Sequence, residues 1–153
     1  MEHERPEDFF EAMAEAYCAR DFKALTRFYD CPGAAYLEDD IVVWSNADSL
    51  EETLRQHCMA NYALGTRSVA ARVVAQSLHG RQHFSVWVNW SHKDFHGIVL
   101  FETCLRYFFR RTSTGGLVIQ LVEMPDRPLV YENENIRPPF RRTRARTGKV
   151  RVV

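Results

Sequence analysis

The histidines are the first residues to consider for chemistry, because imidazole can bind a metal or transfer a proton near neutral pH. His92 and His96 flank a short polar segment, where we expect them to face each other across a turn. Zinc sites use three or four protein ligands, and no third ligand accompanies this pair. We therefore interpret both as solvated turn residues, His57 as a helix surface residue and His83 as part of a polar sheet face. No metal and no cofactor are expected.

The four cysteines are scattered along the chain without a CxxC pair. The N-terminal sequence is polar and acidic and lacks the apolar core of a signal peptide, so we expect a cytoplasmic protein with reduced thiols. A nucleophilic cysteine needs a nearby cation or helix N-terminus to lower its thiol pKa, and none is evident. Three of the four fall inside predicted elements and are expected to be small buried apolar groups: Cys18, Cys58 and Cys104.

Helical signals dominate the first 65 residues. Pro6, followed by two acidic residues, predicts the start of a helix that continues with apolar residues at helical spacing to Tyr17. Asp21 can cap a shorter second helix that contains Leu25, Phe28 and Tyr29, and Cys31-Pro32-Gly33 is expected to end it.

A small hairpin is predicted over 34–44, before a third helix. Asp48 with Glu51, or Ser49 with Glu52, would form the capping box of that helix. It is expected to run to about Leu64 and to end at Gly65.

Beyond Gly65 the apolar residues alternate, which indicates strands near 67–78, 82–92, 97–111 and 116–124. The faces expected to turn toward the helices carry Phe84, Val86, Val88 and Trp90 in the second strand, and Val99, Phe101, Thr103, Leu105, Tyr107 and Phe109 in the third. The chain is therefore predicted to be an α+β domain over residues 1–136. Three N-terminal helices pack on one face of a curved, mostly antiparallel sheet, and a basic tail follows at 137–153.

This order of elements resembles the NTF2-like (SnoaL-like) superfamily of cone-shaped domains with a cystatin-like fold. The resemblance covers roughly residues 7–125 and rests on packing motifs: Ala19-Arg20-Asp21-Phe22, Leu25-x-x-Phe28-Tyr29, Ser49-x-Glu51-Glu52 and Leu117-Val118-Ile119. It implies a pocket between the helices and the concave sheet. It also implies a homodimer through the outer sheet face, which here carries Trp87, Asn89, Glu102 and Arg106. The superfamily contains isomerases, dehydratases, cyclases and non-enzymatic subunits, so the fold does not settle the function.

Enzymes of the ketosteroid isomerase type imply a tyrosine, a carboxylate base and a protonated acid at three positions. The corresponding positions in this chain fall near Met13, Tyr36 and Thr103, and none carries the group required. The remaining catalytic candidates are Tyr17, Tyr107 and Glu123, with Glu123 expected at the pocket mouth.

The residues expected to line the pocket are mostly apolar, which favours a protein that binds a small apolar ligand, or an accessory subunit, over an enzyme. They are Met13, Tyr17, Trp44, Trp90, Thr103, Tyr107 and Glu123. The alternative is a SnoaL-like or ketosteroid isomerase-like enzyme with a non-standard acid/base set.

The net charge of zero hides an asymmetry. All 20 acidic residues lie in residues 1–136, whereas seven of the 20 basic residues follow position 136. A basic tail is typical of nucleic-acid arms, but here docking on the acidic body is the favoured interpretation. A protein-interaction module that uses the tail is a third alternative. No apolar run approaches the ~18 residues that cross a bilayer, so no membrane partner is expected.

Overall fold

A computed structural model describes residues 3–37, 40–77, 82–124 and 149–153. Its helices are α1 (Pro6–Cys18), α2 (Phe22–Thr26) and α3 (Ala47–Ala63). Its strands are β1 (Tyr29–Leu37), β2 (Asp40–Trp44), β3 (Ser68–Gln76), β4 (His83–Lys93), β5 (Val99–Arg111), β6 (Leu117–Glu123) and β7 (Lys149–Val152).

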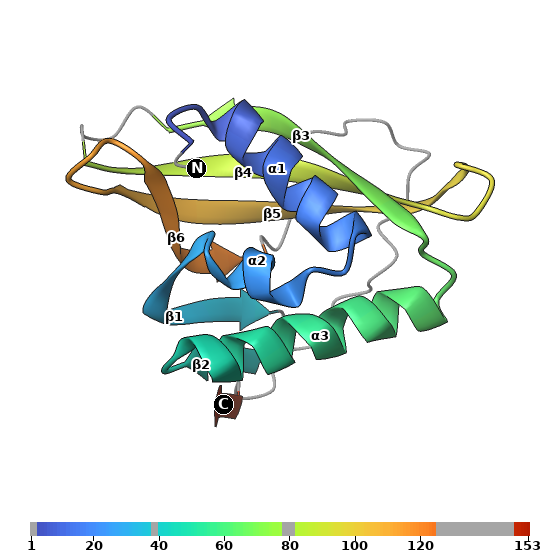
Figure 1. Cartoon of the computed structure of the whole chain (residues 1–153), viewed down its shortest axis with the longest axis horizontal. Coiled ribbons are helices and arrows are strands. Elements are labelled where there is room, and N and C mark those ends of the chain that lie inside the picture. Colours follow the sequence, from blue (N-terminus) through green and yellow to red (C-terminus); the bar gives the residue numbers. More distant parts are fainter. Residues whose placement is uncertain (1–2, 38–39, 78–81, 125–148) are drawn as a thin grey trace.

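The strands form one curved sheet in the order β3-β4-β5-β6-β1-β2-β7. All neighbours are antiparallel except β1 with β6 and β2 with β7, which are parallel. Figure 1 shows α1 lying across the β3–β5 half of the sheet, with α2 and α3 next to the β1–β2 half. The predicted α+β class and the mostly antiparallel sheet are therefore confirmed.

The hydrophobic core lies between α1 and the inner face of the sheet. Phe9 and Phe10 of α1 are each 1% exposed, and both contact the Phe109 ring edge-on, with ring centroids 5.0 and 5.7 Å apart. Alternation placed the inner face of β4 as predicted, and that of β5 from Phe101 to Phe109, because a pleated strand can bury only every second side chain. The prediction was wrong for Val99, which is 47% exposed: Phe101 pairs with His92 but Val99 pairs with Lys93, so a bulge shifts the alternation. The four inner residues of β4 named above all belong to this core.

The second helix is shorter than predicted. It ends at Thr26, and Tyr29 begins β1, so Cys31-Pro32-Gly33 lies within a strand instead of ending a helix. Tertiary contacts override the local signals here. The Asp30 carbonyl accepts a hydrogen bond from the Trp44 indole at 2.9 Å. At Gly33, any Cβ would come within 2.5 Å of the Trp44 ring.

The third helix begins two residues before the predicted capping boxes. Asn46 is the N-cap: its side chain accepts from the Ser49 backbone N–H at 2.9 Å, and the Ser49 hydroxyl accepts in return from the Asn46 N–H at 3.4 Å. The capping box is therefore formed by Asn46 and Ser49, and not by either of the predicted pairs, Asp48 with Glu51 or Ser49 with Glu52. The predicted stop is confirmed, since α3 ends at Ala63 and Gly65 has a φ of 103°.

Most of the predicted tail, including its Arg-rich part at 137–148, lies outside the described residues. Its last residues form β7, which extends the sheet beside β2, and the Arg151 guanidinium lies 3.9 Å from the Asp40 carboxylate. In the described part of the chain, no helix is long and apolar enough to cross a membrane.

Candidate functional site

A hollow of about 160 Å³ lies between the helices and the inner face of the sheet. Six of the seven residues predicted to line a pocket contribute to its wall: Met13, Tyr17, Trp44, Trp90, Thr103 and Tyr107. The wall is predominantly apolar. It includes five tyrosine and tryptophan side chains: Tyr17, Tyr29, Trp44, Trp90 and Tyr107.

Two of the polar groups in this wall are already satisfied within the protein. The Trp90 indole N–H donates to the Tyr107 hydroxyl at 2.8 Å, and the Trp44 indole N–H donates to the Asp30 carbonyl. Burial raises the pKa of Tyr107 well above its ordinary value, so its hydroxyl stays protonated at neutral pH. The sheet side of the hollow therefore presents neutral groups held in fixed positions.

A polar network forms the helix side of the hollow. Asn61 of α3 is 9% exposed, and its amide nitrogen lies 3.0 Å from the Tyr17 hydroxyl oxygen and 3.2 Å from Nε2 of His57. An amide nitrogen carries two hydrogens and no lone pair to accept with, so both neighbours act as acceptors. Burial raises the pKa of Tyr17 and lowers that of His57, which leaves both side chains neutral.

His92 of β4 completes this polar end. Its ring is stacked on Phe101, with centroids 4.3 Å apart, and its Nδ1 lies 3.4 Å from the buried Thr66 hydroxyl. Burial, together with the nearby His57 imidazole, lowers the pKa of His92 to about 4. Both histidines line the hollow. The His57 side chain is also exposed to solvent.

The interpretation of His92 as a solvated turn residue was therefore wrong, because this side chain is only 5% exposed. His57 is an exposed residue of α3, as predicted, but it also lines the hollow. Both positions carried a signal. His92 already lay within the strand predicted near 82–92, and in β4 it continues the inward alternation of Phe84 to Trp90. On α3, the spacing Leu50, Leu54, His57 and Asn61 follows a single helix face, and all but Asn61 line the hollow.

Glu123, by contrast, lies away from the hollow. Its carboxylate is 3.5 Å from the Arg106 guanidinium on the outer face of the sheet. The reason is a bulge in β6: Phe109 pairs with Ile119 but Phe108 pairs with Leu121, which leaves Gln120 as an extra residue. The bulge reverses the alternation, so Val122 faces inward in place of Glu123.

The hollow is free of formal charge. Among the described residues that line it, there is no aspartate, glutamate, lysine or arginine. No group of three possible metal ligands occurs in the part of the chain that the structure describes. The arrangement can therefore enclose an apolar body and offer hydrogen bonds from neutral imidazoles, but it offers no counter-charge to an ion.

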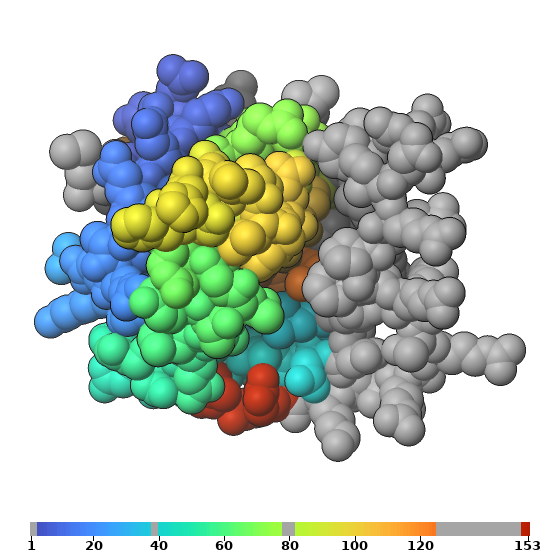
Figure 2. All heavy atoms as spheres, turned by 90° about the vertical axis from the view of Figure 1, so that its right-hand side faces the viewer, coloured from blue at the N-terminus to red at the C-terminus, as the bar shows by residue number. Residues whose placement is uncertain are grey.

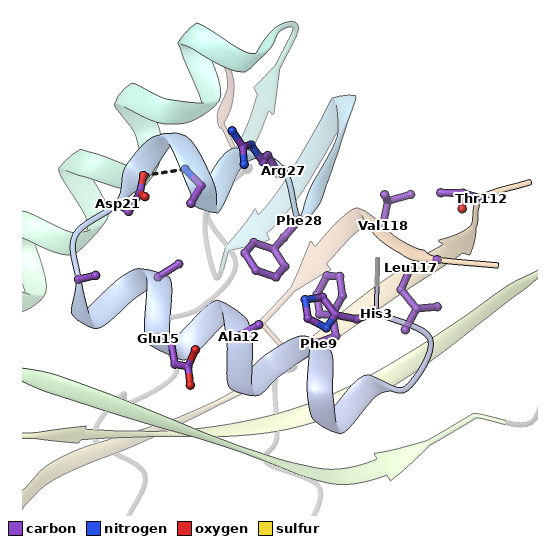
Figure 3. A pocket seen from close by; sticks show the side chains of 14 residues that line it. His3, Phe9, Ala12, Glu15, Asp21, Arg27, Phe28, Thr112, Leu117 and Val118 are labelled. Atoms are coloured by element: carbon purple, nitrogen blue, oxygen red, sulfur yellow. Dashed lines mark hydrogen bonds between the residues drawn. The ribbon is translucent and has the colours of Figure 1, made fainter. Parts of the chain in front are cut away.

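A second, larger depression of about 490 Å³ lies outside the core, between α1, α2 and the β5–β6 turn. Figure 3 shows Phe9, Phe28 and Leu117 in its floor, with Glu15 and Arg27 at its edges. Its Asp21 caps α2 through a 2.9 Å bond from the Ala24 N–H. Glu15, Asp21 and Arg27 are all exposed to water, so a ligand here would compete with solvent for every polar contact. The hollow between the helices and the sheet, with its predominantly apolar wall, is the stronger candidate.

The outer face of the sheet carries the residues predicted to form a dimer interface. The Arg106 guanidinium lies 4.4 Å from the ring centroids of both Trp87 and Phe108 and donates to the Ser85 hydroxyl at 3.2 Å. Asn89 is buried on this face, whereas Glu102 is exposed and accepts a 2.9 Å bond from Ser91.

No known family model matches the sequence, and no curated protein matches it. Solved structures do share its fold. An NTF2-like protein of unknown function from Shewanella oneidensis MR-1 is 12% identical, with a TM-score of 0.57 over 76% of this chain and 92% of that one.

Two further structures agree. A domain of unknown function with a cystatin-like fold from Nostoc punctiforme has a TM-score of 0.59 at 10% identity, covering 76% of this chain and 72% of that one. An NTF2-like protein with a cystatin-like fold from Novosphingobium aromaticivorans has a TM-score of 0.55 at 14% identity, covering 76% of each chain. The predicted NTF2-like, cystatin-like fold is confirmed, and at these identities the likeness concerns the fold alone.

Proposed function

We propose that this protein binds a small, uncharged and largely apolar molecule in the hollow between α1, α3 and the sheet. The observation that carries the proposal is a hollow whose wall is predominantly apolar and aromatic and, among the described residues, contains no formally charged side chain. Its 160 Å³ is close to the roughly 150 Å³ at which an apolar cavity in a protein interior takes up benzene. Transfer of a ring from water into such a space is favourable because apolar surface is removed from water.

Thermal unfolding in the presence of small uncharged molecules tests this function. Toluene and benzene at millimolar concentration are expected to raise the melting temperature, because they bind the folded state only. Ala35 lines the hollow, and Ala35→Leu is expected to fill part of it and abolish the shift. The neighbouring Ala34→Leu on the opposite face is the matched control and should retain it. Equal shifts in both variants would place binding elsewhere.

A second candidate function is proton transfer to or from a bound carbonyl compound, in an enzyme with a non-standard acid/base set. It is favoured by the two neutral imidazoles, His57 and His92, at one end of the hollow. A neutral imidazole can accept a proton from a carbon next to a carbonyl and return one exchanged with solvent. The test is deuterium exchange into cyclohexanone, followed by NMR, in the wild type and in His92→Gln. An exchange rate equal to that of buffer would exclude this activity for that ketone.

The proposal also includes a second copy of the chain as partner, packed through the outer face of the sheet. Trp87 and Arg106 support it, since a half-buried aromatic ring stacked with arginine is the composition typical of interface centres. Light scattering coupled to size-exclusion chromatography measures the mass directly. A monomer at micromolar concentration would remove this part of the proposal and leave ligand binding standing.

A further inference from the structure

The hydrogen-bonding capacity at the polar end of the hollow limits which ligands can be held there. Asn61 donates one amide hydrogen to Tyr17 and the other to Nε2 of His57. Because Nε2 accepts, the single proton of the neutral imidazole resides on Nδ1. His57, which lines the hollow and is also exposed to solvent, thus keeps one N–H that Asn61 and Tyr17 do not use.

His92 offers its second ring nitrogen to the same space. Its Nδ1 is engaged with the Thr66 hydroxyl, which leaves Nε2 for the hollow that the side chain lines. Nε2 accepts when Thr66 accepts from Nδ1, and it donates when Thr66 donates. A carbonyl oxygen can meet only donors, whereas a hydroxyl donates one hydrogen bond and accepts others. A hydroxyl therefore satisfies His57 and His92 together in either tautomer of His92.

The remainder of the hollow selects for shape and charge. Five aromatic side chains line it, and aromatic rings pack favourably edge to face around another ring. Its volume of about 160 Å³ matches that of a cavity that binds a single benzene ring. With no aspartate, glutamate, lysine or arginine in the described lining, a carboxylate or ammonium would lose its hydration without a counter-charge.

We propose that the ligand of the hollow is a small uncharged phenol, with its ring among the aromatic side chains and its hydroxyl between His57 and His92. This inference rests on the proposed binding function and names its ligand class. The three requirements, one ring, one hydroxyl and no charge, come from independent features of the site: its volume and aromatic wall, its two imidazoles, and its uncharged lining.

Calorimetric titration of the full chain at pH 7.5 with three probes tests the inference. Toluene has the ring without the hydroxyl, phenol has both, and benzoate adds a charge. Phenol is expected to bind about tenfold more tightly than toluene, as one additional satisfied hydrogen bond implies. Benzoate is expected to give no measurable heat of binding.

The variant His57→Phe keeps a ring of similar size but removes the ring N–H. It is expected to lower the preference for phenol over toluene to about twofold or less and to leave toluene binding in place. Met59→Leu, on the exposed surface of the same helix, is the control and should keep the wild-type preference. Thermal unfolding of both variants verifies that they are folded.

The outcomes separate the two proposals. Toluene binding with no preference for phenol, or a preference that survives in folded His57→Phe, overturns the phenol inference alone. Failure of all three probes to bind the folded wild type overturns the proposed function and this inference with it. Tighter binding of benzoate than of phenol overturns the argument from charge.

Discussion

On the inner face of β5, Tyr107 and Phe109 are buried among aromatic side chains, whereas Arg106 and Arg110 stand on the outer face of the same strand with carboxylate partners. Arg110 donates to the Asp30 carboxylate from Nε at 3.0 Å and from a terminal nitrogen at 2.8 Å. Successive residues of this strand therefore alternate between an uncharged interior and a charged surface. Polarity reaches the interior only as neutral groups with fixed partners.

This contrast explains why the hollow can hold imidazoles but not carboxylates. Desolvation lowers the pKa of His57 and of His92, so both imidazoles are neutral at pH 7 and remain able to form hydrogen bonds. Glu123 keeps its charge because the β6 bulge turns it toward Arg106. The following predictions test how different the two faces are, beginning with the largest effect.

Neighbouring phenylalanines on the two faces should differ most in stability. Phe109 is 1% exposed and contacts Phe9, Phe10 and Phe84, so Phe109→Ala is expected to lower the free energy of unfolding by about 3–5 kcal/mol. Phe108→Ala, on the outer face, should cost about 1 kcal/mol, mainly the loss of its contact with Arg106. Urea denaturation measures both. Similar losses would break the comparison.

Acid should destabilise the inner face through His92. Its pKa is about 4 when folded and about 6.5 when unfolded, so the unfolded chain binds more protons between these values. The contribution is fully present above pH 6.5 and is lost as the pH falls to 4, by about 3 kcal/mol. His92→Gln removes this titration. Urea midpoints at several pH values should show a shallower acid loss in the variant than in the wild type.

Removing the stacked arginine of the outer face should act on assembly more than on folding. Arg106→Ala is expected to lower the free energy of unfolding of one protomer by about 1 kcal/mol, because its contacts are partly exposed. It should convert the proposed dimer to a monomer. Lys23→Ala, on the exposed surface of α2, removes the same charge and should leave the mass unchanged. A mass unaffected by Arg106→Ala would locate the interface on another face.

The smallest effect is expected for Glu123→Gln. Its ion pair with Arg106 spans 3.5 Å between side chains that are 40% and 29% exposed, so the free energy of unfolding should change by less than about 0.5 kcal/mol. Affinity for toluene or phenol should stay within about twofold of the wild type, because this carboxylate lies outside the hollow. A large loss of affinity would restore Glu123 as a pocket residue.

Local patterns were sufficient for much of the fold. Alternation assigned the inner residues of β4 and those of β5 except Val99, and glycine at position 65 marked the end of α3, because both depend on neighbours in sequence. The same patterns could not predict that Tyr29 begins a strand. That depends on pairing with β6 and β2 and on the close approach of Trp44 to Gly33, both made across the fold.

The sequence alone determined which side of each long strand is apolar, because the pleat repeats every two residues wherever it is unbroken. Only the tertiary structure decided what the apolar sides enclose. It brought Tyr17 of α1, His57 of α3 and His92 of β4 to the wall of one hollow, with Asn61 bonded to Tyr17 and His57 behind them. It also turned Glu123 away through a single extra residue in β6. Spacing along a chain fixes the direction of a side chain within its own element, whereas the partners that meet it depend on how separate elements pack.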